Sequence, residues 1–183
     1  MFNVLKKWGD FRMKKKIINI LFTVGFVFYI SFLLWNIPFK YVSPLEVFST
    51  NRYFSRTLNL IPFYDIFNGN YNGLDIWGNI ILFIPLGIYI NIINKNDAIY
   101  KRICKIFAIS LMFEASQYIF GIGASDITDI ITNTIGGTIG ICIYMLIKKA
   151  FKEDKKVKNF ITICSIVIMI PVTIILIALF IYN

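Results

Sequence analysis

The chain has 183 residues, of which 57% are hydrophobic and only 16% are charged, and its formal net charge is +9. A soluble domain usually has about 25% charged residues, so this composition, with a mean hydropathy of +0.70, excludes an ordinary soluble domain. The sequence contains no histidine, which excludes His-based catalytic triads, His-ligated zinc or haem, and histidine proton relays.

Five apolar segments are long enough to cross a hydrocarbon core of about 30 Å, which needs about 20 helical residues. They are residues 17–37, 74–93, 103–120, 127–147 and 160–182. Three lysines precede the first segment, as in a signal peptide, but its apolar core is longer and no small-residue cleavage site follows. The sequence therefore predicts an all-α, polytopic membrane bundle of about five helices, and we expect the lipid bilayer to be its surroundings.

The basic residues predict the orientation, because cytoplasmic loops carry an excess of Lys and Arg. Only Lys40, Arg52 and Arg56 lie on one side of the predicted bundle, and all other Lys and Arg residues lie on the opposite side. The N-terminus is therefore predicted to be cytoplasmic, in a bacterial cytoplasmic membrane, and the C-terminus to be outside. The same clusters attract anionic lipids, and we predict no nucleic-acid partner. The oligomeric state stays open.

The predicted organisation has four parts. They are a basic tail (residues 1–16), a membrane domain (17–147) with a long outer loop (38–73), a basic loop (148–159) and a C-terminal helix (160–183). The outer loop mixes prolines and glycines with apolar patches, which predicts a segment that lies at the interface or dips into the bundle. Cys104, Cys142 and Cys164 lie in apolar runs without CxxC spacing, so we interpret them as buried thiols.

Polar residues inside apolar segments are the informative ones, because a charge at the bilayer centre costs about 2.5–3.5 kcal/mol. Glu114 and Gln117 share one face of the third segment, and Asp126, Asp129 and Asn133 share one face of the fourth. With a rise of about 1.5 Å per residue, Glu114 lies roughly 9 Å from the outer end of its helix. Asn79 of the second segment is another polar residue in an apolar run, and it lies at a similar distance from the outer end of its helix. The sequence thus predicts a polar pocket in the outer half of the membrane.

Structural roles compete with functional ones at these positions. Asp126 is also suited to cap the fourth helix, and Asp129 complements its dipole. Asn79 and Asn133 are also suited to interhelical hydrogen bonds. No cap explains Glu114, and Arg56 of the outer loop is its hypothetical ion-pair partner, or that of Asp129. The Gly136-xxx-Gly140 spacing predicts close helix packing.

Four ordered motifs resemble the VanZ-like family of small bacterial membrane proteins. They are Arg56-Thr57-Leu58-Asn59-Leu60-Ile61-Pro62-Phe63, Gly78-Asn79-Ile80-Ile81-Leu82-Phe83-Ile84-Pro85-Leu86-Gly87, Glu114-x-x-Gln117, and Asp126-Ile127-Thr128-Asp129-x-x-x-Asn133-Thr134-Ile135-Gly136. The resemblance covers about half of the chain. Many members have R-x-x-D-I-D-D in the last motif, whereas this chain has Gly123 and Thr128 in place of the Arg and the middle Asp. The loss of one cation and one carboxylate together leaves the charge balance unchanged.

The family's namesake is associated with low-level resistance to teicoplanin, so the resemblance implies a cell-envelope role, with a lipid-linked or lipoglycopeptide ligand at the outer leaflet. The candidate acid–base or binding carboxylates are Glu114, Asp129 and Asp126, and the candidate binding residues are Arg56, Asn59, Asn79, Gln117 and Asn133. We expect no metal and no cofactor, although paired acids are also able to hold Mg²⁺. The alternatives are a membrane enzyme acting on a lipid or isoprenoid-linked substrate, and a small transporter.

Overall fold

The computed structural model describes residues 2–39, 49, 54–69 and 73–182, with all side chains in these ranges except those of residues 2–12, 55 and 180. Lys40 and Arg52, which the topology prediction uses, lie outside the described residues. Six helices and two short strands follow in the order α1 (Phe2–Asn36), β1 (Ser55–Asn59), α2 (Tyr64–Phe67), α3 (Gly73–Ile93), α4 (Ile99–Phe120), β2 (Ile122–Asp126), α5 (Ile127–Phe151) and α6 (Asp154–Tyr182) among these residues.

Among the described residues, five helices are long and apolar enough to cross a membrane, which confirms the predicted number. The spans long and apolar enough to cross a membrane are Met13–Asn36, Gly73–Ile93, Ile99–Phe120, Ile127–Phe151 and Asp154–Leu179. Each contains a nearly continuous run of apolar residues, which in lipid must adopt a helix to satisfy its backbone hydrogen bonds. Pro85 and Pro171 lie inside α3 and α6, and both helices continue through them.

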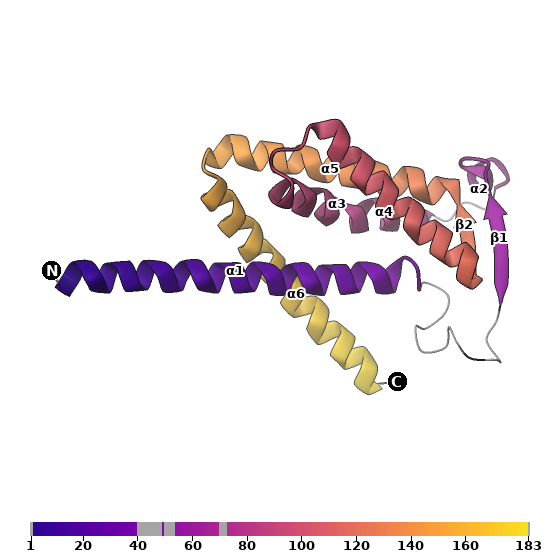
Figure 1. Ribbon diagram of the computed structural model, residues 1–183. Helices are drawn as coiled ribbons and strands as arrows, with labels where there is room; N and C mark the ends of the chain where they lie inside the picture. Colours follow the sequence, from indigo (N-terminus) through magenta and orange to yellow (C-terminus); the bar gives the residue numbers. More distant parts are fainter. Residues whose placement is uncertain (1, 40–48, 50–53, 70–72, 183) are drawn as a thin grey trace. The chain divides into compact units, whose positions relative to one another are not determined.

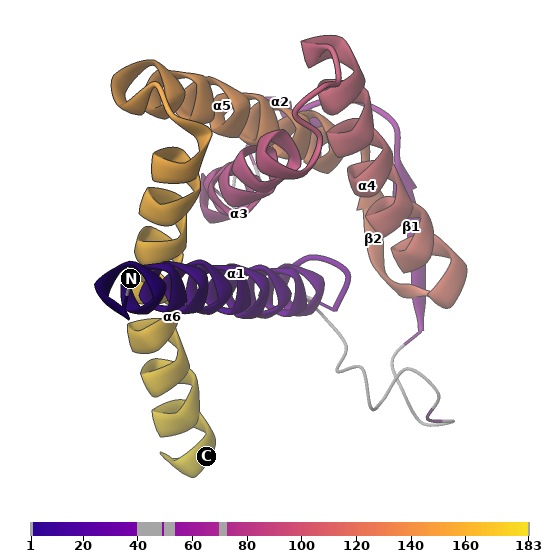
Figure 2. The same ribbon diagram turned by 60° about the vertical axis from the view of Figure 1, so that its left-hand side comes forward.

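The chain divides into two compact units (Figure 1). One unit comprises Met1–Ile30 and Ile147–Asn183, and the other comprises Ser31–Leu146. In the first unit, the Nζ of Lys158 on α6 donates to the Oδ1 of Asn19 on α1 at 2.9 Å. The same ammonium lies 4.4 Å from the centroid of the Phe22 ring. These contacts join α1 and α6, which cross in both views (Figures 1 and 2).

Glycines set the packing of α3 against α5 in the second unit, as the Gly136-xxx-Gly140 spacing predicts. A Cβ at Gly136 would lie 2.2 Å from the carbonyl oxygen of Ile80, and one at Gly140 would lie 2.0 Å from that of Ile84. From the other side, a Cβ at Gly87 would lie 2.0 Å from the carbonyl oxygen of Gly137. The two backbones are therefore in direct contact, which only residues without a side chain permit.

Helix α4 completes this three-helix core. A Cβ at Gly137 would lie 2.5 Å from the side chain of Ile106 on α4, which is fully buried. Phe83 of α3 meets Phe113 of α4 edge to face, with the ring centroids 6.1 Å apart. The polar residues of these three helices are thus held in a closely packed frame.

Strands β1 and β2 form a parallel pair that the sequence did not predict. Asn59 lies opposite Asp126, and Arg56 lies opposite Gly123. Parallel strands need a long connection, and here the connection contains α3 and α4. Gly121 begins the turn into β2 with φ 58° and lies against the Phe54 ring, where a Cβ would approach within 2.4 Å.

Two sequence expectations need correction. The connection between the third and fourth membrane segments contains β2, and the outer loop contains β1 and α2, none of which the sequence pattern predicts. Strands of five residues are too short to show a clear period beside long apolar helices. Cys104 and Cys142, expected to be buried, are exposed on α4 and α5. In a membrane the outer face of a helix contacts lipid, so a weakly polar thiol does not need to be buried there.

The loop between α3 and α4 is held by a compact polar cluster. Arg102 donates to the backbone carbonyls of Asn94 and Lys95 at 3.2 and 2.8 Å, and also to the side chain of Asn91. Lys105 forms a salt bridge with Asp97 at 2.6 Å. These bonds satisfy the carbonyl groups at the end of α3 and order the turn into α4.

Candidate functional site

One face of α4 carries a row of buried polar side chains. Ser110, Glu114 and Gln117 are 0%, 1% and 3% exposed. Their spacing of i, i+4 and i+7 places them on one side of the helix. Glu114 and Gln117 therefore share a face, as predicted, and this face points into the protein.

Glu114 has one oxygen paired and one oxygen without a protein partner. Its Oε2 accepts a hydrogen bond from the backbone N–H of Asp126 at 2.9 Å. Its Oε1 is buried and has no hydrogen-bond partner among the described residues. The carboxylates of Asp129 and Asp126 are close enough to interact with it electrostatically. Because buried polar atoms are nearly always hydrogen-bonded, this oxygen is the feature of the site that most requires an explanation.

Asp126 joins the sheet to the start of α5. Its Oδ1 accepts the backbone N–H of Thr128 at 2.7 Å, and its Oδ2 accepts the side-chain amide of Asn59 at 3.0 Å. The Oδ1 of Asn59 in turn accepts the N–H of Ile61 at 3.1 Å. The first contact is the N-cap role that the sequence left open, and the others attach the outer-loop segment after β1 to the helix.

Asp129 and Thr128 occupy the first turn of α5. Asp129 is half-buried and lies where a carboxylate complements the helix dipole. The Oγ1 of the buried Thr128 accepts the backbone N–H of Phe63 at 3.0 Å. Phe63 adopts a left-handed conformation with φ 58°, which is rare for an aromatic residue. The hydrogen bond to Thr128 therefore helps to hold a strained turn over the start of α5.

Three carboxamides extend the polar region. Asn133 on α5 is fully buried and donates to the Oγ of Ser110 on α4 at 2.9 Å. Gln117 donates to the carbonyl of Ile37 at 2.9 Å. Asn79 is buried on α3. Among the described residues, Asn133 Oδ1, Gln117 Oε1 and Asn79 Nδ2 have no hydrogen-bond partner, as is also true of Glu114 Oε1.

Arg56, for which the sequence suggests an ion pair with Glu114 or Asp129, contacts the end of α4 in the structure. Its Nη2 donates to the carbonyl of Ile119 at 2.8 Å. The guanidinium lies 4.8 Å from the centroid of the Phe54 ring and 6.0 Å from that of Tyr118. Because β1 pairs in parallel with β2, Arg56 is placed opposite Gly123, near the end of α4. It therefore binds the last turn of α4, where a cation is favourable.

The sequence prediction missed Ser110 and the acceptor role of Thr128. Ser110 precedes Glu114 by one helical turn, so the i, i+4 spacing was a signal that could have found it. The contact between Thr128 and Phe63 joins residues 65 apart in the sequence, and no local pattern indicates it.

The donor set of the site consists of carboxylates and carboxamides. Within the described ranges, no group of three or more His, Cys, Asp or Glu side chains is arranged to hold a metal ion. Carboxylates and carboxamides offer hydrogen bonding, and a carboxyl group such as that of Glu114 is also able to exchange a proton.

Five membrane-spanning helices with buried polar side chains between three of them define a multi-pass helical membrane protein. The family model described as VanZ/LLP1 matches residues 26–148. Protein VanZ of Enterococcus faecium is 36% identical over 144 residues, which cover 78% of this chain and 86% of that protein. The chain therefore belongs to the VanZ/LLP1 family. No solved structure matches it.

Proposed function

We propose that this protein contributes to bacterial tolerance of teicoplanin-type lipoglycopeptides, and that it acts from the outer half of the cytoplasmic membrane. Its membership of the VanZ/LLP1 family supports the resistance role. Teicoplanin differs from vancomycin in an acyl chain that anchors the drug in the outer leaflet. A protein that acts within that leaflet would therefore affect teicoplanin more than vancomycin.

The observation that carries the site assignment is the buried carboxyl group of Glu114. A carboxylate inside a membrane helix is costly and is usually retained for function. Its Oε1 lacks a protein partner in the described part of the chain, as do the nearby acceptors of Gln117 and Asn133. A ligand with hydroxyl or amide hydrogens would satisfy these acceptors. Sugar and peptide groups of lipid-linked wall precursors and of lipoglycopeptides have this chemistry.

The predicted topology supports action at the outer leaflet. The ends of α4 and α5 nearest Glu114 and Asp129 are the ends that the distribution of Lys and Arg assigns to the outside. Leu60, Ile61 and Phe67, in the outer loop after β1, are exposed apolar side chains. This pattern is typical of a segment that lies in the headgroup region of a membrane.

The role in resistance is tested by expressing the wild-type protein in a sensitive Gram-positive host. We expect a higher minimal inhibitory concentration of teicoplanin than with an empty vector, and an unchanged value for vancomycin. Expression is checked by a quantitative blot of the membrane fraction. Equal tolerance of both drugs, or of neither, would contradict the proposal.

The alternative function is that of a membrane enzyme in which Glu114 is a general base. The buried Oε1 favours it, because a general base needs a lone pair that no donor of the described protein occupies. Mass spectrometry of lipid extracts distinguishes the two functions. An enzyme produces a new lipid or lipid-linked species that disappears with Glu114→Gln, whereas a protein that binds or excludes the drug changes only its occupancy at the cell surface.

A further inference from the structure

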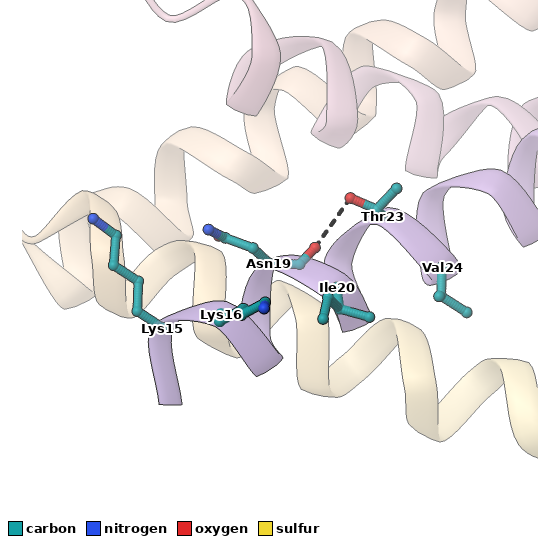
Figure 3. A pocket seen from close by; sticks show the side chains of 6 residues that line it. All are labelled: Lys15, Lys16, Asn19, Ile20, Thr23 and Val24. Atoms are coloured by element: carbon teal, nitrogen blue, oxygen red, sulfur yellow. Dashed lines mark hydrogen bonds between the residues drawn. The ribbon is translucent and has the colours of Figure 1, made fainter. Parts of the chain in front are cut away.

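A hollow of about 500 Å³ lies beside α1 at the start of its membrane-spanning part. Its lining has no residue in common with the polar site around Glu114. Figure 3 shows its lining residues, which all belong to α1: Lys15, Lys16, Asn19, Ile20, Thr23 and Val24. We refer to it below as the α1 hollow.

The lining changes from cationic to apolar along the helix. The two lysines come first, Asn19 and Ile20 follow one turn later, and Thr23 and Val24 follow after another turn. The distance from Lys16 to Val24 along the axis is about 12 Å at a rise of about 1.5 Å per residue. Ile20 and Val24 are 52% and 47% exposed, so the inner part of the hollow presents apolar side chains.

A third ammonium group lies near this surface. Lys158 of α6 donates to the Oδ1 of Asn19, which lines the hollow. This bond places the positive charge of the ammonium group 2.9 Å from a side-chain oxygen that lines the hollow. Two other lysines of the same unit form salt bridges, Lys148 with Asp154 and Lys156 with Glu153.

We propose that the α1 hollow binds one anionic phospholipid, with the phosphate at the lysines and an acyl chain along Ile20 and Val24. The order of the lining matches the order of groups in a phospholipid, from the charged phosphate through the polar glycerol esters to the chain. Asn19, one turn beyond the lysines, lies at the level of the esters where the chain begins. Basic pockets beside membrane helices recognise anionic headgroups in this way. The lipid joins α1 to α6 by neutralising lysines from both helices.

The binding experiment uses the full-length protein in detergent and native mass spectrometry. The probes are short-chain phosphatidylglycerol, short-chain phosphatidylcholine and glycerophosphoglycerol, which has the same headgroup without chains. We expect one molecule of phosphatidylglycerol to bind at least tenfold more tightly than either of the other two. Equal binding of phosphatidylcholine, or equal binding of glycerophosphoglycerol, would overturn the proposal, because the first shows no charge selectivity and the second shows a free-phosphate site.

Variants locate the site. Lys15→Gln with Lys16→Gln should weaken binding of phosphatidylglycerol at least tenfold. Lys101→Gln with Lys149→Gln removes the same charge from exposed positions outside the hollow and should change it less than twofold. Equal losses in both pairs would show an effect of net charge alone and overturn the assignment.

A second pair of substitutions distinguishes the loss of charge from misfolding of the first double variant. Lys15→Arg with Lys16→Arg keeps both charges and should retain binding within about threefold. Lys158→Gln, tested in parallel, should weaken binding several-fold because it removes the contribution of α6. The proposal would be contradicted if Lys158→Gln and the double variant Lys15→Gln with Lys16→Gln, measured separately, both retained full affinity.

Discussion

Asp126 and Glu114 are carboxylates of the same site with different hydrogen-bond partners. Asp126 accepts the Thr128 N–H and the Asn59 amide, so both of its oxygens have protein partners. Glu114, in contrast, keeps one oxygen without a partner in the described region. Of the candidate carboxylates, Glu114 therefore has the geometry of a group that receives a ligand, whereas Asp126 has the geometry of a group that supports the site.

We predict that Asp126→Ala lowers the free energy of unfolding by about 1–2 kcal/mol, because it removes the N-cap of α5. Asp126→Asn should cost clearly less, since an Asn side chain is also a good N-cap. Unfolding of both variants by sodium dodecyl sulfate in mixed micelles measures the difference. Equal losses for Ala and Asn would mean that the negative charge, and not the cap, supplies the stability.

The loop between α3 and α4 gives a pH-dependent prediction. The hydrogen bond from Lys105 holds the pKa of the Asp97 carboxyl below its ordinary value of 3.8. The folded state therefore gains stability from the ionised carboxyl above pH 3.8, and this gain is lost as the pH falls through the lower pKa of the folded state. Asp97→Asn should unfold with a shallower dependence on pH below 3.8 than the wild type. Thermal melts across an acid series measure the two slopes, and identical slopes would contradict the prediction.

At the scale of elements, the α3–α5 contact is the feature that a single methyl group should disturb. A Cβ at Gly136 would lie 2.2 Å from a backbone oxygen, whereas one at Gly78 would have no atom within 4 Å. Gly136→Ala should destabilise the protein by about 1–3 kcal/mol through overpacking. Gly78→Ala should be neutral or stabilising by up to about 1 kcal/mol, because Ala favours helix over Gly.

The same unfolding assay in mixed micelles compares these two glycine variants. The helix propensity changes by the same amount in both, so the difference between them isolates the close approach of the helices. A Gly136→Ala variant as stable as Gly78→Ala would show that α3 and α5 are not in backbone contact.

The elements also show which features the sequence predicts well. Long apolar runs predict all five spans within a few residues of their ends, because in lipid such runs must be helical. The shared face of Glu114 and Gln117 follows from helical spacing alone. The parallel pairing of β1 with β2 does not, because it depends on contacts between residues 67 apart, such as Ser55 and Ile122. That pairing brings Arg56 to the carbonyl of Ile119, a contact between residues 63 apart that no local pattern indicates.

At the scale of the whole molecule, the topology remains a prediction from the charge distribution. We expect a cysteine at Asn68, in the outer loop, to react with a membrane-impermeant maleimide in intact cells. A cysteine at Asn96, between α3 and α4, should react only after permeabilisation. Both residues are exposed. The background should lack the native thiols at Cys104, Cys142 and Cys164, of which two are exposed. The reverse labelling pattern would show that the topology is opposite to the predicted one and that Glu114 lies in the inner half of the membrane.

The central claim is that the buried Glu114 carboxyl group is needed for tolerance of teicoplanin. The most direct test compares the minimal inhibitory concentrations of teicoplanin for cells that express the wild type, Glu114→Gln or Glu153→Gln at matched levels. Glu153 is exposed and lies outside the site, so its variant is the control for the same chemical change. The account predicts that Glu114→Gln falls to the empty-vector value while Glu153→Gln keeps wild-type tolerance. Full tolerance with Glu114→Gln would contradict the account and show that the carboxyl group is structural.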